Sequence, residues 1–100
     1  MDEKTMAEIK IIAAEMQKIY DMAYRAYLPI VTELCERIAS QNEIEHTLDS
    51  LLDFACEEKC LRLFKKLCRR YYPLYPQCIV DYVGFYREIW DTPDEQSNGE

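Results

Sequence analysis

The side chains best suited to binding chemistry are six cations within residues 59–70, a run that contains no Asp or Glu. On a helix, five of them share about a third of the circumference, and Lys65 lies just beyond it. Such a face can bind anionic groups, and Tyr71 and Tyr72 follow directly. We therefore predict a basic partner-binding face that consists of Lys59, Arg62, Lys66, Arg69 and Arg70. The alternative is a solvated face whose charges pair with acidic neighbours.

The rest of the chain is acidic, because residues 1–58 carry a net charge of −8 and residues 71–100 carry −5. The overall charge of −7 disfavours nucleic acid as the partner of residues 59–72, since nucleic-acid-binding domains are usually basic overall. The acidity permits another hypothesis, in which carboxylates mimic nucleic acid as in anti-restriction and anti-CRISPR inhibitors. Solubility is the simpler explanation of the same charge.

The residues that could bind a metal or exchange electrons are Cys35, Cys56, Cys60, Cys68 and Cys78. Structural zinc sites use two closely spaced ligand pairs, and only Cys56 and Cys60 form such a pair here. The two glutamates between them would disfavour the reactive thiolate form. All five cysteines fall at apolar positions of the expected helices. We therefore expect them to pack as small hydrophobic residues, without a metal or cofactor.

Known catalytic motifs are missing from the sequence, which has no Gly-rich phosphate loop, no G-x-S-x-G and no H-E-x-x-H. His46 is the only histidine, and carboxylates such as Glu45 and Asp49 recur at helical spacing along a polar face. Such a run of carboxylates is usually solvated. We therefore expect that the protein is not an enzyme.

Apolar residues at three- and four-residue steps predict one long first helix over about 5–39. Thr5 and Glu8 form a capping-box pattern at its start. Pro29 lies on the face opposite the apolar stripe, so it should kink the helix around the core without ending it.

The second expected helix runs to about residue 71 and begins at a capping-box pattern of Asn42 and Glu45. Its apolar positions before and after residue 56 are rotated by roughly 150° from each other. Either the helix breaks near Glu57 and Glu58, or one helix buries opposite faces against two neighbours, one of which could be another copy of the chain. Because no Gly or Pro lies there, we expect the continuous helix.

A short third helix should start at Pro76. Its apolar residues cover more than half of its circumference, which indicates a helix wedged between neighbours or an exposed patch. Since Tyr and Trp often anchor interfaces, we predict an aromatic partner surface of Tyr72, Tyr82, Tyr86 and Trp90, with core packing as the alternative. Residues 92–100 should form a disordered acidic tail.

These elements predict an all-α fold of two long antiparallel helices and a short third one, a small helical bundle in a single domain of residues 1–91. No apolar stretch is long enough to span a membrane, and the odd number of cysteines indicates a reducing, cytoplasmic setting. We expect a small regulatory module that binds a protein partner. Homodimerisation is an open alternative, because long helices with apolar stripes often find their missing burial in a second chain.

Overall fold

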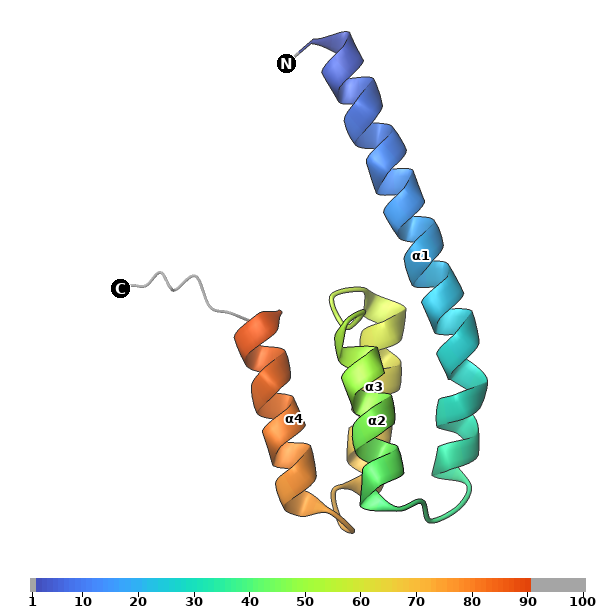
Figure 1. Cartoon of the computed structure of the whole chain (residues 1–100), viewed down its shortest axis with the longest axis vertical. Helices are drawn as coiled ribbons and strands as arrows, with labels where there is room; N and C mark the ends of the chain where they lie inside the picture. The colour runs from blue at the N-terminus through green and yellow to red at the C-terminus, as the bar shows by residue number, and fades with distance from the viewer. Residues whose placement is uncertain (1, 91–100) are drawn as a thin grey trace, which may run out of the picture.

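The computed structural model describes residues 2–90, which form four helices and no strand (Figure 1). They are α1 (Glu3–Cys35), α2 (Gln41–Leu52), α3 (Glu58–Tyr71) and α4 (Pro76–Ile89). Successive helices run in opposite directions (Figure 1). The all-α class and the helical bundle are confirmed, whereas the expected count of three helices is corrected to four. The predicted tail at 92–100 and the last residue of the predicted domain lie outside the described residues.

The second expected helix is in fact two helices, because the chain turns back on itself over residues 53–57. Asp53 ends α2, and Glu57 begins α3 with a carboxylate that accepts the N–H of Cys60 at 3.0 Å. The turn allows both apolar faces to meet the same core, so the rotation between them requires no second neighbour. The prediction of a continuous helix is therefore wrong, and the alternative break is correct.

α1 and α2 each begin a few residues earlier in the chain than predicted. Asp2 caps α1 by accepting the N–H of Thr5 at 2.8 Å, and Ser40 forms the capping box of α2 with Glu43. These two residues still have extended backbone, whereas Thr5 and Asn42 are already inside their helices. α1 continues through the exposed Pro29, as expected, and its axis curves gently in Figure 1.

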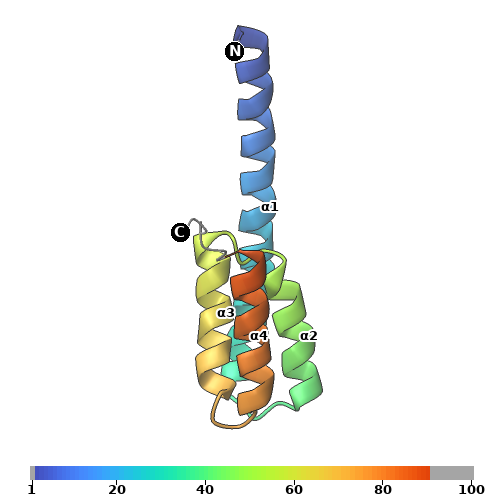
Figure 2. The ribbon, with the colours of Figure 1, turned by 90° about the vertical axis from the view of Figure 1, so that its left-hand side faces the viewer.

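The core lies between the C-terminal half of α1 and the other three helices. α3 packs against both α1 and α2, and α4 packs against both α2 and α3. Figure 2 shows α2 and α3 on opposite sides of the bundle, so their outer faces point in opposite directions. The largest completely buried side chains are Tyr71, Ile44, Leu48, Leu51, Leu67, Val31 and Cys60.

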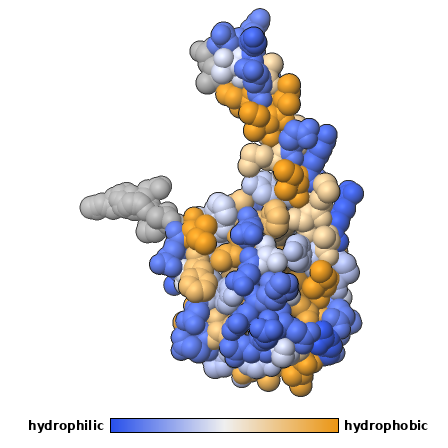
Figure 3. All heavy atoms as spheres, in the orientation of Figure 1, coloured by the Kyte–Doolittle hydropathy of each residue, from blue (hydrophilic) through white to orange (hydrophobic). Residues whose placement is uncertain are grey.

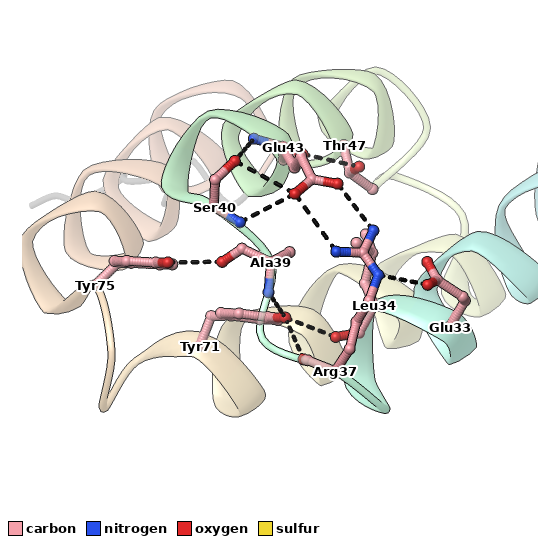
Figure 4. A network of polar contacts seen from close by, with 9 residues as sticks. All are labelled: Glu33, Leu34, Arg37, Ala39, Ser40, Glu43, Thr47, Tyr71 and Tyr75. Carbon is pink, nitrogen blue, oxygen red and sulfur yellow. Dashed lines mark hydrogen bonds and ion pairs between the residues drawn. The ribbon is translucent and has the colours of Figure 1, made fainter.

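Tyr71 fastens the connection between α1 and α2 from inside this core (Figure 4). Its hydroxyl accepts a hydrogen bond from the N–H of Ala39 at 2.9 Å. The same hydroxyl donates to two carbonyl oxygens, that of Leu34 at 2.7 Å and that of Arg37 at 2.8 Å. Tyr75 donates to the carbonyl of Ala39 at 2.6 Å. These bonds satisfy backbone groups beyond the reach of helical hydrogen bonds, and they fix the end of α1.

An ion-pair network around Arg37 also stabilises the connection between α1 and α2 (Figure 4). Arg37 binds Glu33, and its guanidinium lies 2.8 Å from a carboxylate oxygen of Glu43. The Arg37 guanidinium, together with the backbone N–H of Ser40, lowers the pKa of Glu43 to about 2 from its ordinary value of 4.5. A carboxyl whose pKa is depressed by folding stabilises the fold above its unfolded pKa. That contribution is lost as the pH falls through the folded pKa.

We therefore expect Glu43→Gln to lower the unfolding temperature at neutral pH, and the difference from the parent chain to shrink as the pH falls from 4.5 through 2. Thermal unfolding followed by circular dichroism at several pH values measures this difference. Glu36→Gln is the matched control, because the Glu36 side chain is exposed and forms no ion pair within residues 2–90. A deficit of Glu43→Gln that is equally large below pH 2 would contradict the assignment.

Candidate protein-interaction surfaces

The N-terminal half of α1 projects beyond the bundle as a single helix (Figure 1). Every residue from Asp2 to Ile19 is exposed, and we call residues 3–19 the arm. The bundle ends at Tyr20, whose ring centroid lies 6.5 Å from that of Phe54. The arm explains why the radius of gyration is 16.5 Å, compared with about 13 Å for a compact chain of 100 residues.

An apolar stripe runs along one side of the arm and is not covered by any other described part of the chain (Figure 3). At 100° per residue, it points in the same direction as Ala23, Val31 and Leu34, which α1 buries in the bundle. The same stripe is therefore buried in the core in the C-terminal half of α1 and exposed on the surface in the N-terminal half. Its large members are Met6, Ile9, Ile12, Met16 and Ile19, which are 43% to 59% exposed.

The residues of the predicted basic face make different kinds of contact in the structure. Lys59 lies 5.6 Å from the ring centroid of Tyr24 on α1. Arg70 turns toward the end of α1 and donates to the carbonyls of Cys35 and Arg37 at 3.0 and 3.1 Å. These two cations stabilise the packing of α3 on α1, which leaves fewer of them for a partner.

The remaining cations of α3 lie on its outer face. Arg62 forms an exposed ion pair with Glu58 at 3.0 Å, whereas Lys65, Lys66 and Arg69 form no ion pair within residues 2–90. All four side chains are exposed. The available basic surface is therefore centred on Lys65, Lys66 and Arg69.

Part of this basic surface borders a groove of about 480 Å³ between α3 and α4, which we call the α3–α4 groove. Its rim carries Lys65 and Arg69 from α3 and Arg87 from α4. Sequence reasoning placed Lys65 just outside the predicted face and missed Arg87. Arg87 is the only cation of its helix, and no spacing in the sequence connects it to α3. The apolar floor of the groove is formed by Leu61, Phe64, Cys68, Val83 and Tyr86.

The predicted aromatic residues lie at separate places rather than on one surface. Tyr82 is 8% exposed, and its hydroxyl donates to the carboxylate of Asp49 at 2.6 Å; burial and this carboxylate raise the pKa of the hydroxyl. Trp90 donates its indole N–H to a carbonyl of α2 at 2.7 Å. Tyr86 lines the α3–α4 groove, and Tyr72 is exposed near the C-terminal end of α3. Tyr82 and Trp90 therefore hold α4 on α2, whereas Tyr72 and Tyr86 border open surface.

Gly84 lies inside α4 beside a second hollow of about 370 Å³. This hollow adjoins the first one, because Val83 and Arg87 line both. A Cβ built on Gly84 would meet no atom within 4 Å among the described residues. Within residues 2–90, no contact therefore requires glycine at this position.

We expect Gly84→Ala to raise the free energy of unfolding by about 0.5–1 kcal/mol, since alanine favours the helix and nothing obstructs its methyl group. Urea unfolding of the variant and the parent chain measures the change. A loss of stability would show that the free fold itself requires glycine there.

The cysteines offer little chemistry of their own. Burial raises the pKa of the Cys60 thiol to about 11 and that of Cys68 to about 12, and it also raises the pKa of Cys78. Such thiols are protonated at neutral pH and react poorly. Cys56 is exposed in the turn between α2 and α3, so the prediction that all five pack within helices is wrong for this residue. Within residues 2–90, no group of three or more His, Cys, Asp or Glu side chains could hold a metal ion.

No described helix is long and apolar enough to cross a membrane. No protein-family model, no curated protein and no solved structure matches this chain. Two uncovered surfaces, the arm and the α3–α4 groove, offer both apolar area and charge for binding.

Proposed function

We propose that this protein is a non-catalytic interaction module that docks a helical protein partner on the arm of α1. The observation that supports this most strongly is the apolar stripe between Met6 and Ile19, which the fold holds away from its own core. A single helix of this length is only marginally stable in water. Burial of the stripe against another helix would stabilise the arm and provide specific association.

A second copy of the chain is the partner best supported by the sequence of the stripe. The apolar residues lie symmetrically about the midpoint between residues 12 and 13. Two antiparallel arms related by a two-fold axis at this midpoint would place each apolar residue opposite an apolar residue of the other chain. The resulting pairs are Met6 with Ile19, Ile9 with Met16, and Ile12 with Ala13.

The position of the bundle favours the antiparallel direction. The stripe of the arm and the core-facing side of α1 are the same side of the helix, so the bundle lies on the side that a partner arm must approach (Figure 1). In a parallel pair, both bundles would lie at the same level between the two helices and collide. An antiparallel pair places the bundles at opposite ends of the paired arms.

Charges beside the stripe oppose this pairing weakly. Glu8 and Glu15 lie on one edge of the stripe, and antiparallel pairing brings Glu8 of each chain near Glu15 of the other. Each such like-charge pair costs about 0.2–0.5 kcal/mol. Full burial of the half-exposed apolar side chains contributes about 1 kcal/mol each, or about 10 kcal/mol for two arms. Apolar burial therefore exceeds the repulsion by a wide margin.

We expect Glu8→Lys to strengthen the dimer roughly tenfold, because each lysine would then lie near Glu15 of the other chain. In a parallel pair the same change would weaken association, since Glu8 would lie near Lys10 of the other chain. Sedimentation equilibrium measures the dissociation constant. Glu36→Lys, which lies outside the arm, controls for the change in net charge. Weaker association of Glu8→Lys would contradict the antiparallel arrangement.

The direct test of this function is the solution mass by light scattering, at two protein concentrations and at low and high salt. We expect a dimer at the higher concentration that dissociates on dilution. Salt should strengthen it, because salt screens the glutamate edge and does not weaken apolar burial. A monomer under all conditions would contradict a second copy as the partner.

The expected cytoplasmic setting belongs to this proposal and is supported by the five free cysteines. Two other hypotheses remain predictions. α2 carries Glu45 and Asp49 on the side toward α4 and Asp53 at its C-terminal end, and the nucleic-acid-mimic hypothesis would use these carboxylates. Nucleic-acid binding would use the outer face of α3, where Lys66 and Arg69 remain available.

A further inference from the structure

We propose that the α3–α4 groove is a second docking site, and that its occupant is an acidic amphipathic helix of a partner protein. The groove is bordered by the hollow beside Gly84, which shares Val83 and Arg87 with it and is otherwise lined by Tyr72, Ile79 and Val80. The residues of α3 and its C-terminal cap that line the groove and this hollow run from Leu61 to Tyr72, roughly 17 Å along the helix axis. That length accommodates about three turns of a bound helix.

The apolar floor and the cationic walls of the groove determine which kind of helix would bind there. Its floor is apolar and includes Phe64 and Val83, against which a helix could place its own apolar stripe. Lys65 and Arg69 stand on one wall and Arg87 on the other, and none of them is engaged by a carboxylate within residues 2–90. Carboxylates on both edges of a bound helix would therefore meet a cation on each wall.

The opposite side of α4 presents the opposite charge. The hollow between α2 and α4 is lined by the carboxylates of Glu45 and Asp81 and by no cation. An acidic helix is thus attracted to the α3 side and repelled from the α2 side. The acidic residues 91–100 of this chain are a poor occupant, because they contain no large apolar side chain that could cover the floor.

Gly84 provides a separate reason to expect a closely packed occupant. Glycine weakens a helix interior, and no described part of this chain approaches Gly84 closely enough to need it. The residue lies beside the groove, next to Val80 and Tyr72, which are 53% and 52% exposed. A missing side chain at this position allows the backbone of a second helix to approach α4 closely.

Fluorescence polarisation with a designed probe tests this site on the full-length chain. The probe is a synthetic helical peptide with leucines along one face and glutamates on both edges, and its counterpart has lysine at every glutamate position. A DNA duplex is the third probe. We expect the acidic peptide to bind, with an affinity that falls as salt is added, and the lysine peptide to bind at least roughly tenfold more weakly.

Two kinds of variant should locate the binding. Gly84→Leu should reduce the affinity at least roughly tenfold while the chain stays folded, because leucine favours the helix and its Cβ meets no atom within 4 Å among the described residues. Arg87→Glu should weaken binding by a similar factor. Lys66→Glu is the matched control, since Lys66 is exposed on α3 but does not line the groove, and it should leave the affinity unchanged.

Equal affinity for both peptides, or an acidic-peptide affinity that Gly84→Leu leaves unchanged, would overturn the proposal. Stronger binding of DNA that Lys66→Glu impairs as much as Arg87→Glu would also overturn it, in favour of a nucleic-acid face on α3. The groove shares no residue with the arm. Ile9→Glu places a charge in the apolar stripe of the arm and should abolish self-association, so the titration with this variant should give the same affinity for the acidic peptide.

Discussion

Replacing Ile9 by glutamate should convert the dimer into a monomer and leave the unfolding of the bundle unchanged. Ile9 lies near the centre of the apolar stripe, and two-fold symmetry introduces the new charge twice into each dimer. Burying an unpaired carboxylate in an apolar interface costs several kcal/mol, so we expect the dissociation constant to rise at least roughly a hundredfold. Light scattering measures the mass, and thermal unfolding reports the stability of the bundle.

Ile11→Glu is the matched control for this experiment. It makes the same chemical change in the same arm, but Ile11 points away from the stripe and is 63% exposed. We expect Ile11→Glu to remain dimeric. Loss of the dimer in both variants would mean that added negative charge, and not the stripe, controls association.

Tyr71→Phe should lower the free energy of unfolding by about 1–3 kcal/mol, because it leaves the buried N–H of Ala39 without its acceptor. In a domain of this size, each kcal/mol corresponds to a shift of about 4–8 °C in Tm. Calorimetry or urea unfolding measures the effect.

Tyr72→Phe is the natural control for Tyr71→Phe, because Tyr72 is the next residue along the chain and is 52% exposed. We expect its removal of a hydroxyl to have little effect on stability. An equal decrease in the free energy of unfolding of the two variants would contradict the conclusion that the Tyr71 hydroxyl stabilises the α1–α2 connection.

The helices themselves could be predicted from apolar periodicity, and so could the position of the break in the second one. The rotation of the apolar face at residue 56 indicated the position of the turn correctly, but the helix propensity of Glu57 and Glu58 favoured one continuous helix. Tertiary packing decided the outcome, since folding back lets Leu51 and Leu67 share one core. Local propensity is too small to oppose that burial.

The interaction surfaces could be predicted only in part. The stripe of α1 looks the same in the half that the bundle covers and in the half that it leaves open, so periodicity cannot distinguish Ile12 from Val31. Arg70 shares a face with Arg69 on the helical wheel, yet it is bound to the end of α1. Arg87 joins Lys65 only through the packing of α4 on α3. Each of these outcomes depends on which helices become neighbours, and a single helical wheel does not contain that information.

Disulfide formation between arms tests the central claim most directly. Met6→Cys and Ile19→Cys, each made in a Cys56→Ser background, should form a covalent heterodimer when the two chains are mixed and oxidised, because antiparallel arms place these positions opposite each other. Met6→Cys alone should stay monomeric on a non-reducing gel, since its two copies would be roughly 20 Å apart along the paired arms. Efficient self-crosslinking of Met6→Cys, or no crosslink in the mixture, would contradict an antiparallel dimer formed by the arm.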